Sequence, residues 1–283
     1  MPIDALLLLA ASAGVHAAWN IRLKGSHDPE TAAMIAVITP GILAGVAILA
    51  AAAVGAIELP DSYLLLSAFA GVAELLYFVT LAKAYARAPI SVVYPIVRGL
   101  NPLLAVLVGV GLLRETLLGA QPYGIALIVA GLVALRPPWR ALGGGIDPRG
   151  VAFAVAAGAL SAIGSAIESV GVRGVGAVAF LCLTWGVTGL LYLALARRRA
   201  ASPRPTPARA LTGVLIIGGH FLVMAAFAVA PLSLVIPFRE SAILLVSGWG
   251  LLRAREAVRP IDLAMRAGGA LAIVGGALLI ALG

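Results

Sequence analysis

The sequence predicts an all-α integral membrane protein with ten transmembrane helices, arranged as two inverted five-helix repeats. Three observations lead to this fold class: the apolar composition, the regular spacing of the apolar runs and an internal repeat. Of the 283 residues, 62% are hydrophobic and 11% are charged, which lies outside the range of soluble globular domains. Because a membrane-crossing helix needs about 20 apolar residues, ten helices would use most of the chain. The composition therefore excludes a large domain outside the membrane.

Charged or proline-rich breaks separate the apolar runs, and we interpret each run as one membrane-crossing helix. The runs cover residues 3–21, 31–57, 62–82, 89–112 and 120–135, followed by residues 150–171, 175–196, 210–229, 231–252 and 262–282. The first run resembles the core of a signal peptide, but no Lys or Arg precedes it and it continues through Trp19. We therefore expect it to be retained as the first helix.

An internal repeat supports the count of ten helices. Residues 84–95 align with residues 226–237 at a shift of 142, and seven of the twelve positions are identical, including the frame Pro-x-Ser-x-Val-x-Pro. Each copy then holds five helices, so residues 1–140 form one repeat and residues 141–283 form the other. An odd number of helices per repeat places the second copy upside down relative to the first. Inverted repeats of this kind are typical of secondary transporters.

Several short motifs have counterparts in a known family. They are His16 to Asn20 with Lys24, Ala88 to Pro95 followed by Asn101 and Pro102, Leu112 to Glu115 before Gly124 to Gly131, and Leu251 to Glu256 before a glycine-rich last helix. With these motifs, nearly the whole chain resembles the EamA-type branch of the drug/metabolite transporter superfamily. The resemblance implies a ten-helix carrier whose central cavity is lined mostly by helices 1, 3, 4, 6, 8 and 9. It names no substrate, because members of the superfamily carry very different metabolites.

The distribution of positive charge predicts the orientation in the cell (inner) membrane. Fifteen Lys and Arg residues lie in odd-numbered connections, whereas the even-numbered connections hold only Arg114 and Arg173. Cytoplasmic loops carry the excess of positive residues, so we expect a multi-pass protein with both termini outside. The better-known relatives place both termini inside, which leaves two competing expectations.

Ionisable residues inside the predicted helices mark the candidate site. Each of Glu74, Arg98, Arg239 and Glu240 costs roughly 2.5–3.5 kcal/mol near the centre of a bilayer, so these groups must face a wet cavity or one another. Arg98 and Arg239 lie at nearly matching positions of the two repeats and could together hold an anionic group. Alternatively, Arg98 pairs with Glu240, its counterpart at the 142-residue shift. Both arrangements are compatible if the substrate exchanges with an internal partner.

Polar residues at helical spacing extend this site to other helices. Tyr94, Arg98 and Asn101 share one face of the fourth helix, which is our first choice for substrate contact. The remaining candidates are His16, Trp19 and Asn20 on the first helix, Glu74 and Tyr77 on the third, Arg239 and Glu240 on the ninth, and His220 on the eighth. Ser161, Ser165 and Glu168 form a similar stripe on the sixth helix. Met224 and Phe227 are expected to pack in the core, and Trp185 and Trp249 to pack or to anchor the chain at the membrane interface.

These observations predict a secondary transporter that moves a small polar metabolite, amino-acid-like or an organic anion or zwitterion, by alternating access. Alternatives are an exporter of lipophilic cations or drugs and, with less support, a membrane-embedded enzyme. We expect no enzymatic activity, because the ionisable groups are scattered across both repeats, and no cofactor or metal, because the sequence lacks phosphate-loop and metal-pair motifs. No nucleic-acid partner is expected, since the basic residues lie in connections between apolar runs. The expected partners are the substrate and the lipid bilayer, with protons as a candidate coupling ion through Glu74 or Glu240. The chain is expected to be a monomer or a homodimer, with close helix packing at Gly41 and Gly45 and at Gly268 and Ala272.

Overall fold

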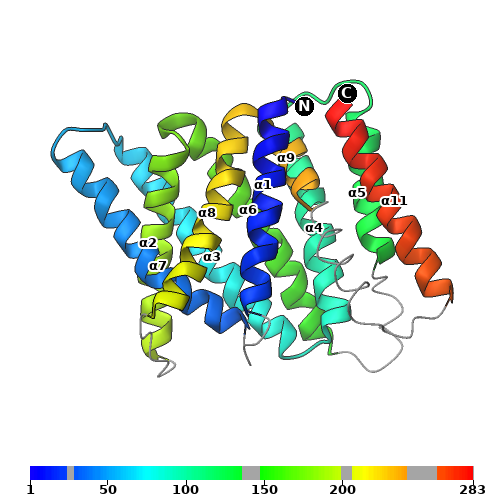
Figure 1. The fold of residues 1–283 in the computed structure, drawn as a ribbon, viewed down its shortest axis with the longest axis horizontal. Helices are drawn as coiled ribbons and strands as arrows, with labels where there is room; N and C mark the ends of the chain where they lie inside the picture. The colour runs from blue at the N-terminus through cyan, green and yellow to red at the C-terminus, as the bar shows by residue number, and fades with distance from the viewer. Residues whose placement is uncertain (24–28, 136–146, 199–205, 241–259, 283) are drawn as a thin grey trace.

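The computed structural model describes residues 1–23, 29–135, 147–198, 206–240 and 260–282 (Figure 1). The regular structure of these residues is entirely helical, as the sequence predicts. The helices are α1 (Ile3–Leu23), α2 (Pro29–Ala53), α3 (Asp61–Tyr85), α4 (Ile90–Gly111), α5 (Gln121–Leu135), α6 (Pro148–Val175), α7 (Ala177–Arg198), α8 (Pro207–Val229), α9 (Leu232–Glu240) and α11 (Pro260–Leu282).

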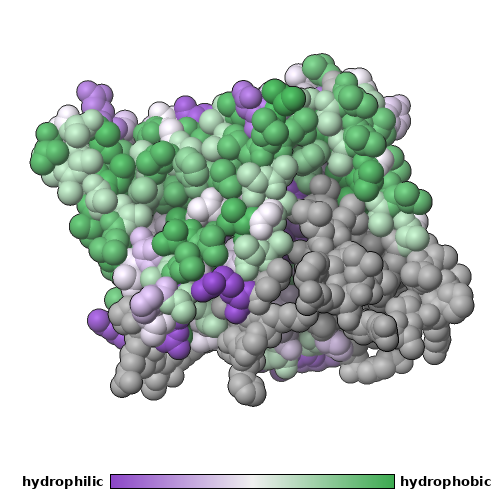
Figure 2. All heavy atoms as spheres, viewed as in Figure 1, coloured by the Kyte–Doolittle hydropathy of each residue, from purple (hydrophilic) through white to green (hydrophobic). Residues whose placement is uncertain are grey.

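Six of these helices are long and apolar enough to cross a membrane. Their apolar stretches are Thr31–Ala53, Asp61–Tyr85, Val92–Gly111, Pro148–Val175, Ala177–Arg198 and Pro207–Val229. Large apolar side chains such as Leu43, Leu107 and Leu190 lie on the outside of the bundle and are more than half exposed. Figure 2 shows hydrophobic atoms over most of the described face, with hydrophilic atoms near its upper and lower edges. Because lipid tails cover such a surface favourably, the chain is an integral membrane protein.

Local sequence signals explain where several helices begin and end. The side chain of Asp147 accepts a hydrogen bond from the backbone N–H of Arg149 at 2.9 Å, and Thr206 caps α8 in the same way through Arg209. In both cases a proline follows the cap and fits the first helical turn. The predicted second helix was too long at its end: α2 stops at Ala53, because the chain turns at Gly55, where φ is +74°.

The helices pack in pairs that join the two halves of the chain. α1 lies against α8, α2 against α7, α3 against α6, α4 against α9 and α5 against α11. In Figure 1 the pair α5 and α11 forms one edge of the bundle and α2 lies toward the other. The remaining helices occupy the middle, where they can surround a site.

Glycines allow two of these pairs to approach closely. A Cβ atom on Gly41 would lie 2.6 Å from the carbonyl oxygen of Trp185, and one on Gly45 would lie 2.6 Å from the Cα atom of Gly186. These contacts match the close packing expected of Gly41 and Gly45. The expectation for the last helix was one position off: Gly268 has open space beside it, and the carbonyl of Gly269 contacts α5 instead.

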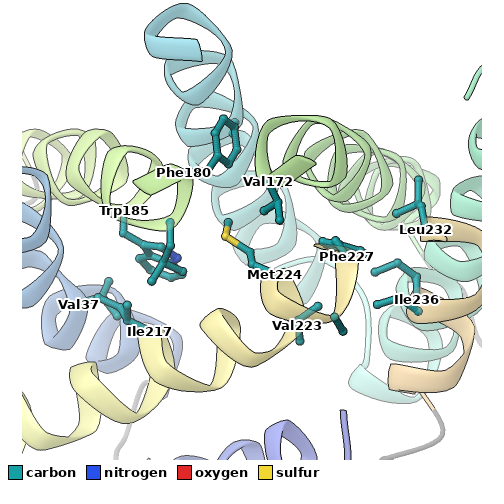
Figure 3. Close-up of a cluster of buried hydrophobic side chains, with 14 of the residues drawn as sticks. Val37, Val172, Phe180, Trp185, Ile217, Val223, Met224, Phe227, Leu232 and Ile236 are labelled. Atoms are coloured by element: carbon teal, nitrogen blue, oxygen red, sulfur yellow. The ribbon is translucent and has the colours of Figure 1, made fainter. Parts of the chain in front are cut away.

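A large apolar cluster runs through the bundle, and many of its bulky members lie toward the end that contains the chain termini. Its fully buried members include Phe180, Met224, Phe227, Leu232 and Ile236. In Figure 3, Phe227 of α8 lies between Val172 of α6 and Ile236 of α9. Met224 and Phe227 therefore serve as core residues, as their spacing indicated.

The two ends of the bundle differ in charge. The N-terminal amine donates to the carbonyl oxygens of Ile280 and Ala281, each at 3.3 Å, so the termini adjoin at one end (Figure 1), called here the terminal end. The opposite, basic end holds positive residues at helix ends: Arg22, Lys83, Arg87, Arg149, Arg197, Arg198 and Arg209. Arg22 contacts the start of α8 and Arg87 lies over the ring of Phe153 near the start of α6.

Candidate functional site

A cavity of about 240 Å³ lies in the middle of the bundle and receives side chains from α1, α2, α3, α4, α6, α7, α8 and α9. Its polar and charged lining comes from both halves of the chain. The first half contributes Ser12, His16, Glu74, Tyr77, Arg98 and Asn101, and the second half contributes Ser161, Ser165, Glu168, Tyr192, His220 and Arg239. A polar cavity inside an apolar bundle is where a membrane protein can hold a polar molecule away from lipid.

The cavity reaches toward the basic end. Trp19, Ala33 and Leu81 line it, and each lies about one helical turn from the basic end of its helix. Toward the terminal end, the apolar cluster around Phe227 fills the space between α6, α8 and α9. The two ends of the cavity are therefore not equivalent.

One ion pair joins the two halves beside the cavity. Nη1 of Arg98 on α4 donates to both carboxylate oxygens of Glu240 on α9, each at 3.2 Å. The guanidinium lies 5.5 Å from the centre of the Tyr94 ring. Of the two arrangements considered for Arg98, the structure contains the pair with Glu240, while Arg98 still lines the cavity.

A second pair connects α6 and α8. Nε2 of His220 lies 2.9 Å from a carboxylate oxygen of Glu168, and the ring of Trp185 meets the imidazole edge to face at 5.5 Å. Trp185 is 5% exposed and lines the cavity, so it packs in the core and is not an interfacial anchor. The physical reason is that α7 begins at Ala177, which places Trp185 two turns inside the helix. Trp249 lies outside the described residues.

Two charged residues in the cavity make few or no direct contacts with other polar groups of the described residues. The only hydrogen bond of Glu74 among the described residues is a 3.5 Å contact with the hydroxyl of Tyr192. Arg239 makes no hydrogen bond or ion pair with any part of the chain that the structure describes. Asn101 is 3% exposed and its Oδ1 atom also has no hydrogen-bond partner there. These three groups are the ones most able to meet a bound molecule.

The structure brings most of the predicted site residues to this cavity. Eight of them line it: His16, Trp19, Glu74, Tyr77, Arg98, Asn101, His220 and Arg239. Tyr94 and Glu240 lie against Arg98 and are not among the described lining residues. The side chain of Asn20 lies outside the described residues.

Sequence reasoning missed the contributions of the second and the seventh helices. Tyr192 and Trp185 of α7 line the cavity, although the lining was expected from helices 1, 3, 4, 6, 8 and 9. A tyrosine in the middle of an apolar helix is a signal that could have indicated this, because its hydroxyl needs a partner there. Glu168 was recognised as part of a stripe but not included among the site residues.

A network of hydrogen bonds stands at the terminal end, beyond the apolar cluster. The carboxylate of Glu115 accepts from the backbone N–H groups of Leu232 at 2.8 Å and Ser233 at 2.9 Å, which start α9. Arg173 binds the same carboxylate at 3.2 Å and also donates to the carbonyls of Phe227 and Ala230. This Glu115 clamp ties the connection after α4 to the ends of α6, α8 and α9.

Fold and site together define a helical membrane protein with a polar central cavity. No family model and no curated protein matches the sequence. The fold, however, is one that crystal structures contain: 29 chains of solved structures match it. One protein of known crystal structure is similar over 100% of this chain and 98% of its own, with a TM-score of 0.75 and 21% sequence identity. A likeness at this identity concerns the fold alone.

Proposed function

We propose that the protein is a secondary transporter of the EamA type, which moves a small polar metabolite with an anionic group by alternating access. The observation that carries this proposal is the central cavity, whose charged lining comes from both halves of the chain. In transporters built from inverted repeats, substrate sites lie at the interface of the repeats near the middle of the bilayer. A charged site at that depth indicates a pathway for polar solutes.

The contacts between helices support ten transmembrane helices in two inverted repeats, residues 1–140 and 141–283. If the first five helices correspond to the second five, the contact of α1 with α8 corresponds to the contact of α6 with α3, and both occur. Residues related by the repeat shift also meet directly. Arg98 and Glu240 are 142 positions apart, which is the repeat shift, and Gly45 packs closely against Gly186, one position short of that shift. A pseudo-twofold axis would produce such meetings.

The asymmetry of the cavity supports alternating access in preference to an open channel. The cavity reaches toward the basic end, while the part of the apolar cluster around Phe227 and the Glu115 clamp lie at the terminal end. A carrier needs a state with access from one side and a second state with access from the other. With the charge-based orientation, this state faces the cytoplasm and both termini lie outside the cell membrane.

A second candidate is export of lipophilic cations. Its supporting observation is the aromatic lining, which includes Trp19, Tyr77, Phe78, Trp185 and Tyr192, next to the carboxylate of Glu74. Aromatic faces attract cations. The same carboxylate is the preferred candidate for proton coupling, because Glu240 is already bound by Arg98.

Counterflow in proteoliposomes tests the proposal. Compounds are first selected by thermal-shift measurements on the purified protein, using amino acids, organic acids, sugar phosphates and quaternary amines, because a ligand raises stability by mass action. Proteoliposomes that contain a carrier and are loaded with the unlabelled binder should accumulate the labelled compound, and this uptake should saturate. Arg98→Ala should lower the rate of uptake. Chemical conversion of the compound, or flux that does not saturate, would contradict a carrier.

A further inference from the structure

Two pairs of ionisable groups lie in or beside the cavity, and two further charged residues form no ion pair within the described part of the chain. Arg98 is bound by Glu240 and Glu168 lies against His220. Arg239 and Glu74 form no ion pair in the described part of the chain, and both line the cavity. The guanidinium and the carboxylate attract each other across this cavity without direct contact.

An uncompensated charge in such a place is unfavourable until a partner arrives. Removing a charge from water is unfavourable unless an opposite charge or several hydrogen bonds replace the water. Guanidinium binds carboxylate through two parallel hydrogen bonds, and a carboxylate accepts strong hydrogen bonds from an ammonium group. A molecule that brings both groups would compensate Arg239 and Glu74 together.

The remaining lining is consistent with a small molecule of this kind. The cavity volume of about 240 Å³ is below the roughly 300–1,000 Å³ of pockets for drug-sized ligands. The amide of Asn101 has an unused oxygen for a hydrogen-bond donor of the ligand. The aromatic side chains of Trp19, Tyr77 and Trp185 offer an apolar wall.

We infer that the cavity selects a zwitterion, with Arg239 binding its carboxylate and Glu74 binding its ammonium group. The inference rests on the proposed function, because it names the substrate class of the same cavity. A simple organic anion would bring a second negative charge close to Glu74, and a simple cation would leave Arg239 uncompensated. Both charged residues therefore act as specificity determinants.

Matched probes on the full chain in detergent test this inference. Each free L-amino acid is compared by thermal shift with its methyl ester, which keeps only the positive charge, and with its N-acetyl derivative, which keeps only the negative one. At least one free amino acid should bind about tenfold or more tightly than both of its derivatives, as expected for the loss of a charged hydrogen bond.

Variants of Arg239 and Glu74 test the two charge contacts one at a time. Arg239→Gln should weaken binding of the amino acid about tenfold or more and leave binding of its methyl ester unchanged. Glu74→Gln should weaken binding of the amino acid and leave binding of its N-acetyl derivative unchanged. A variant that merely folds poorly would bind all of the probes more weakly to a similar degree. Arg149→Gln and Glu58→Gln are matched controls, because both side chains are exposed outside the cavity.

Two results would overturn the inference: no free amino acid binds better than its derivatives, or binding is unaffected by both Arg239→Gln and Glu74→Gln. Transport is measured separately. If a singly charged compound shows counterflow and Arg239→Gln does not change its rate, the zwitterion site is refuted but the proposed carrier function is not. Binding with the expected pattern but without counterflow would refute the carrier and leave the site intact.

Discussion

At the residue scale, the ion pair between Arg98 and Glu240 links the halves of the chain beside the cavity. The side chain of Glu240 is 3% exposed and that of Arg98 is 26% exposed. Removing one partner leaves the other charged and poorly solvated, which is the costly situation for buried pairs. We therefore expect the pair to hold α4 and α9 in one arrangement, since separating them would leave both charges without a partner.

Exchanging the two charges tests this pair. We expect Arg98→Glu alone or Glu240→Arg alone to destabilise the protein by up to about 3 kcal/mol, measured as a lower midpoint of thermal unfolding in detergent. The double exchange should recover at least half of the loss, because opposite charges again face each other. Additive losses in the double variant would show that the two residues are not coupled.

Charged residues identified this site in the sequence, whereas some of its uncharged lining residues were missed. Ionisable residues inside apolar runs are so costly that Glu74, Arg98 and Arg239 had to face a cavity or one another. Trp185 and Tyr192 carry no such cost and were missed. The choice between Arg98 with Arg239 and Arg98 with Glu240 also needed the structure, because helical spacing gives a shared face but not the partner on another helix.

At the element scale, the Glu115 clamp fixes the start of α9. Its carboxylate takes the place of an N-cap residue and accepts from two of the N–H groups that a helix leaves unpaired at its start. A negative charge there is also favoured by the helix dipole. The connection after α4 thereby holds an element of the other half.

Neutralising this carboxylate should loosen the terminal end. Glu115→Gln is expected to lower stability by about 1–3 kcal/mol, because charged hydrogen bonds to two backbone donors and to Arg173 are weakened. Glu58→Gln serves as a control, since Glu58 is exposed. Thermal unfolding of both variants, together with hydrogen exchange at Leu232 and Ser233, measures the effect. Equal behaviour of the two variants would show that the clamp contributes nothing.

Close packing of α2 against α7 is also required for the stability of the fold. Gly186→Ala adds a methyl group 2.7 Å from the Cα atom of Gly45, so the helices must separate at a cost of about 1–3 kcal/mol. Gly218 has open space beside it, and Gly218→Ala should leave stability within about 1 kcal/mol of the original. Unfolding midpoints of the two variants should therefore differ, and similar midpoints would contradict the contact.

Helix positions within the described residues were predictable because the apolar runs and their proline-rich breaks are local features of the chain. Helix ends were not: α2 ended early at the turn around Gly55, and α6 extends from Pro148 to Val175, beyond the apolar run on both sides. Polar caps and terminal turns determine such ends, and hydropathy does not report them. The packing glycine of α11 also needed the structure, because adjacent glycines differ only in which neighbour they face.

At the scale of the whole molecule, charge separates the basic end from the terminal end. Positive-inside bias predicts that the basic end lies in the cytoplasm. A reporter that is active only in the cytoplasm, fused after the last residue, is therefore expected to be inactive, and one that requires the outside should be active. Cytoplasmic activity at the C-terminus would reverse the orientation.

Alternating access requires the cavity to open in turn to the two sides of the membrane, and cysteine labelling tests this without knowledge of the substrate. Cys182, the only cysteine of the chain, is replaced by Ala, and Ser161→Cys places a thiol in the cavity lining. Ile128→Cys provides a control position that is fully buried outside the described cavity lining.

A membrane-impermeant maleimide is applied to sealed vesicles of each orientation. With alternating access, the thiol at position 161 should react from both sides, faster from the basic end, and Glu115→Gln should increase the rate from the terminal end. Position 128 should stay unlabelled. Labelling of position 161 from the basic end alone, with and without Glu115→Gln, would contradict alternating access.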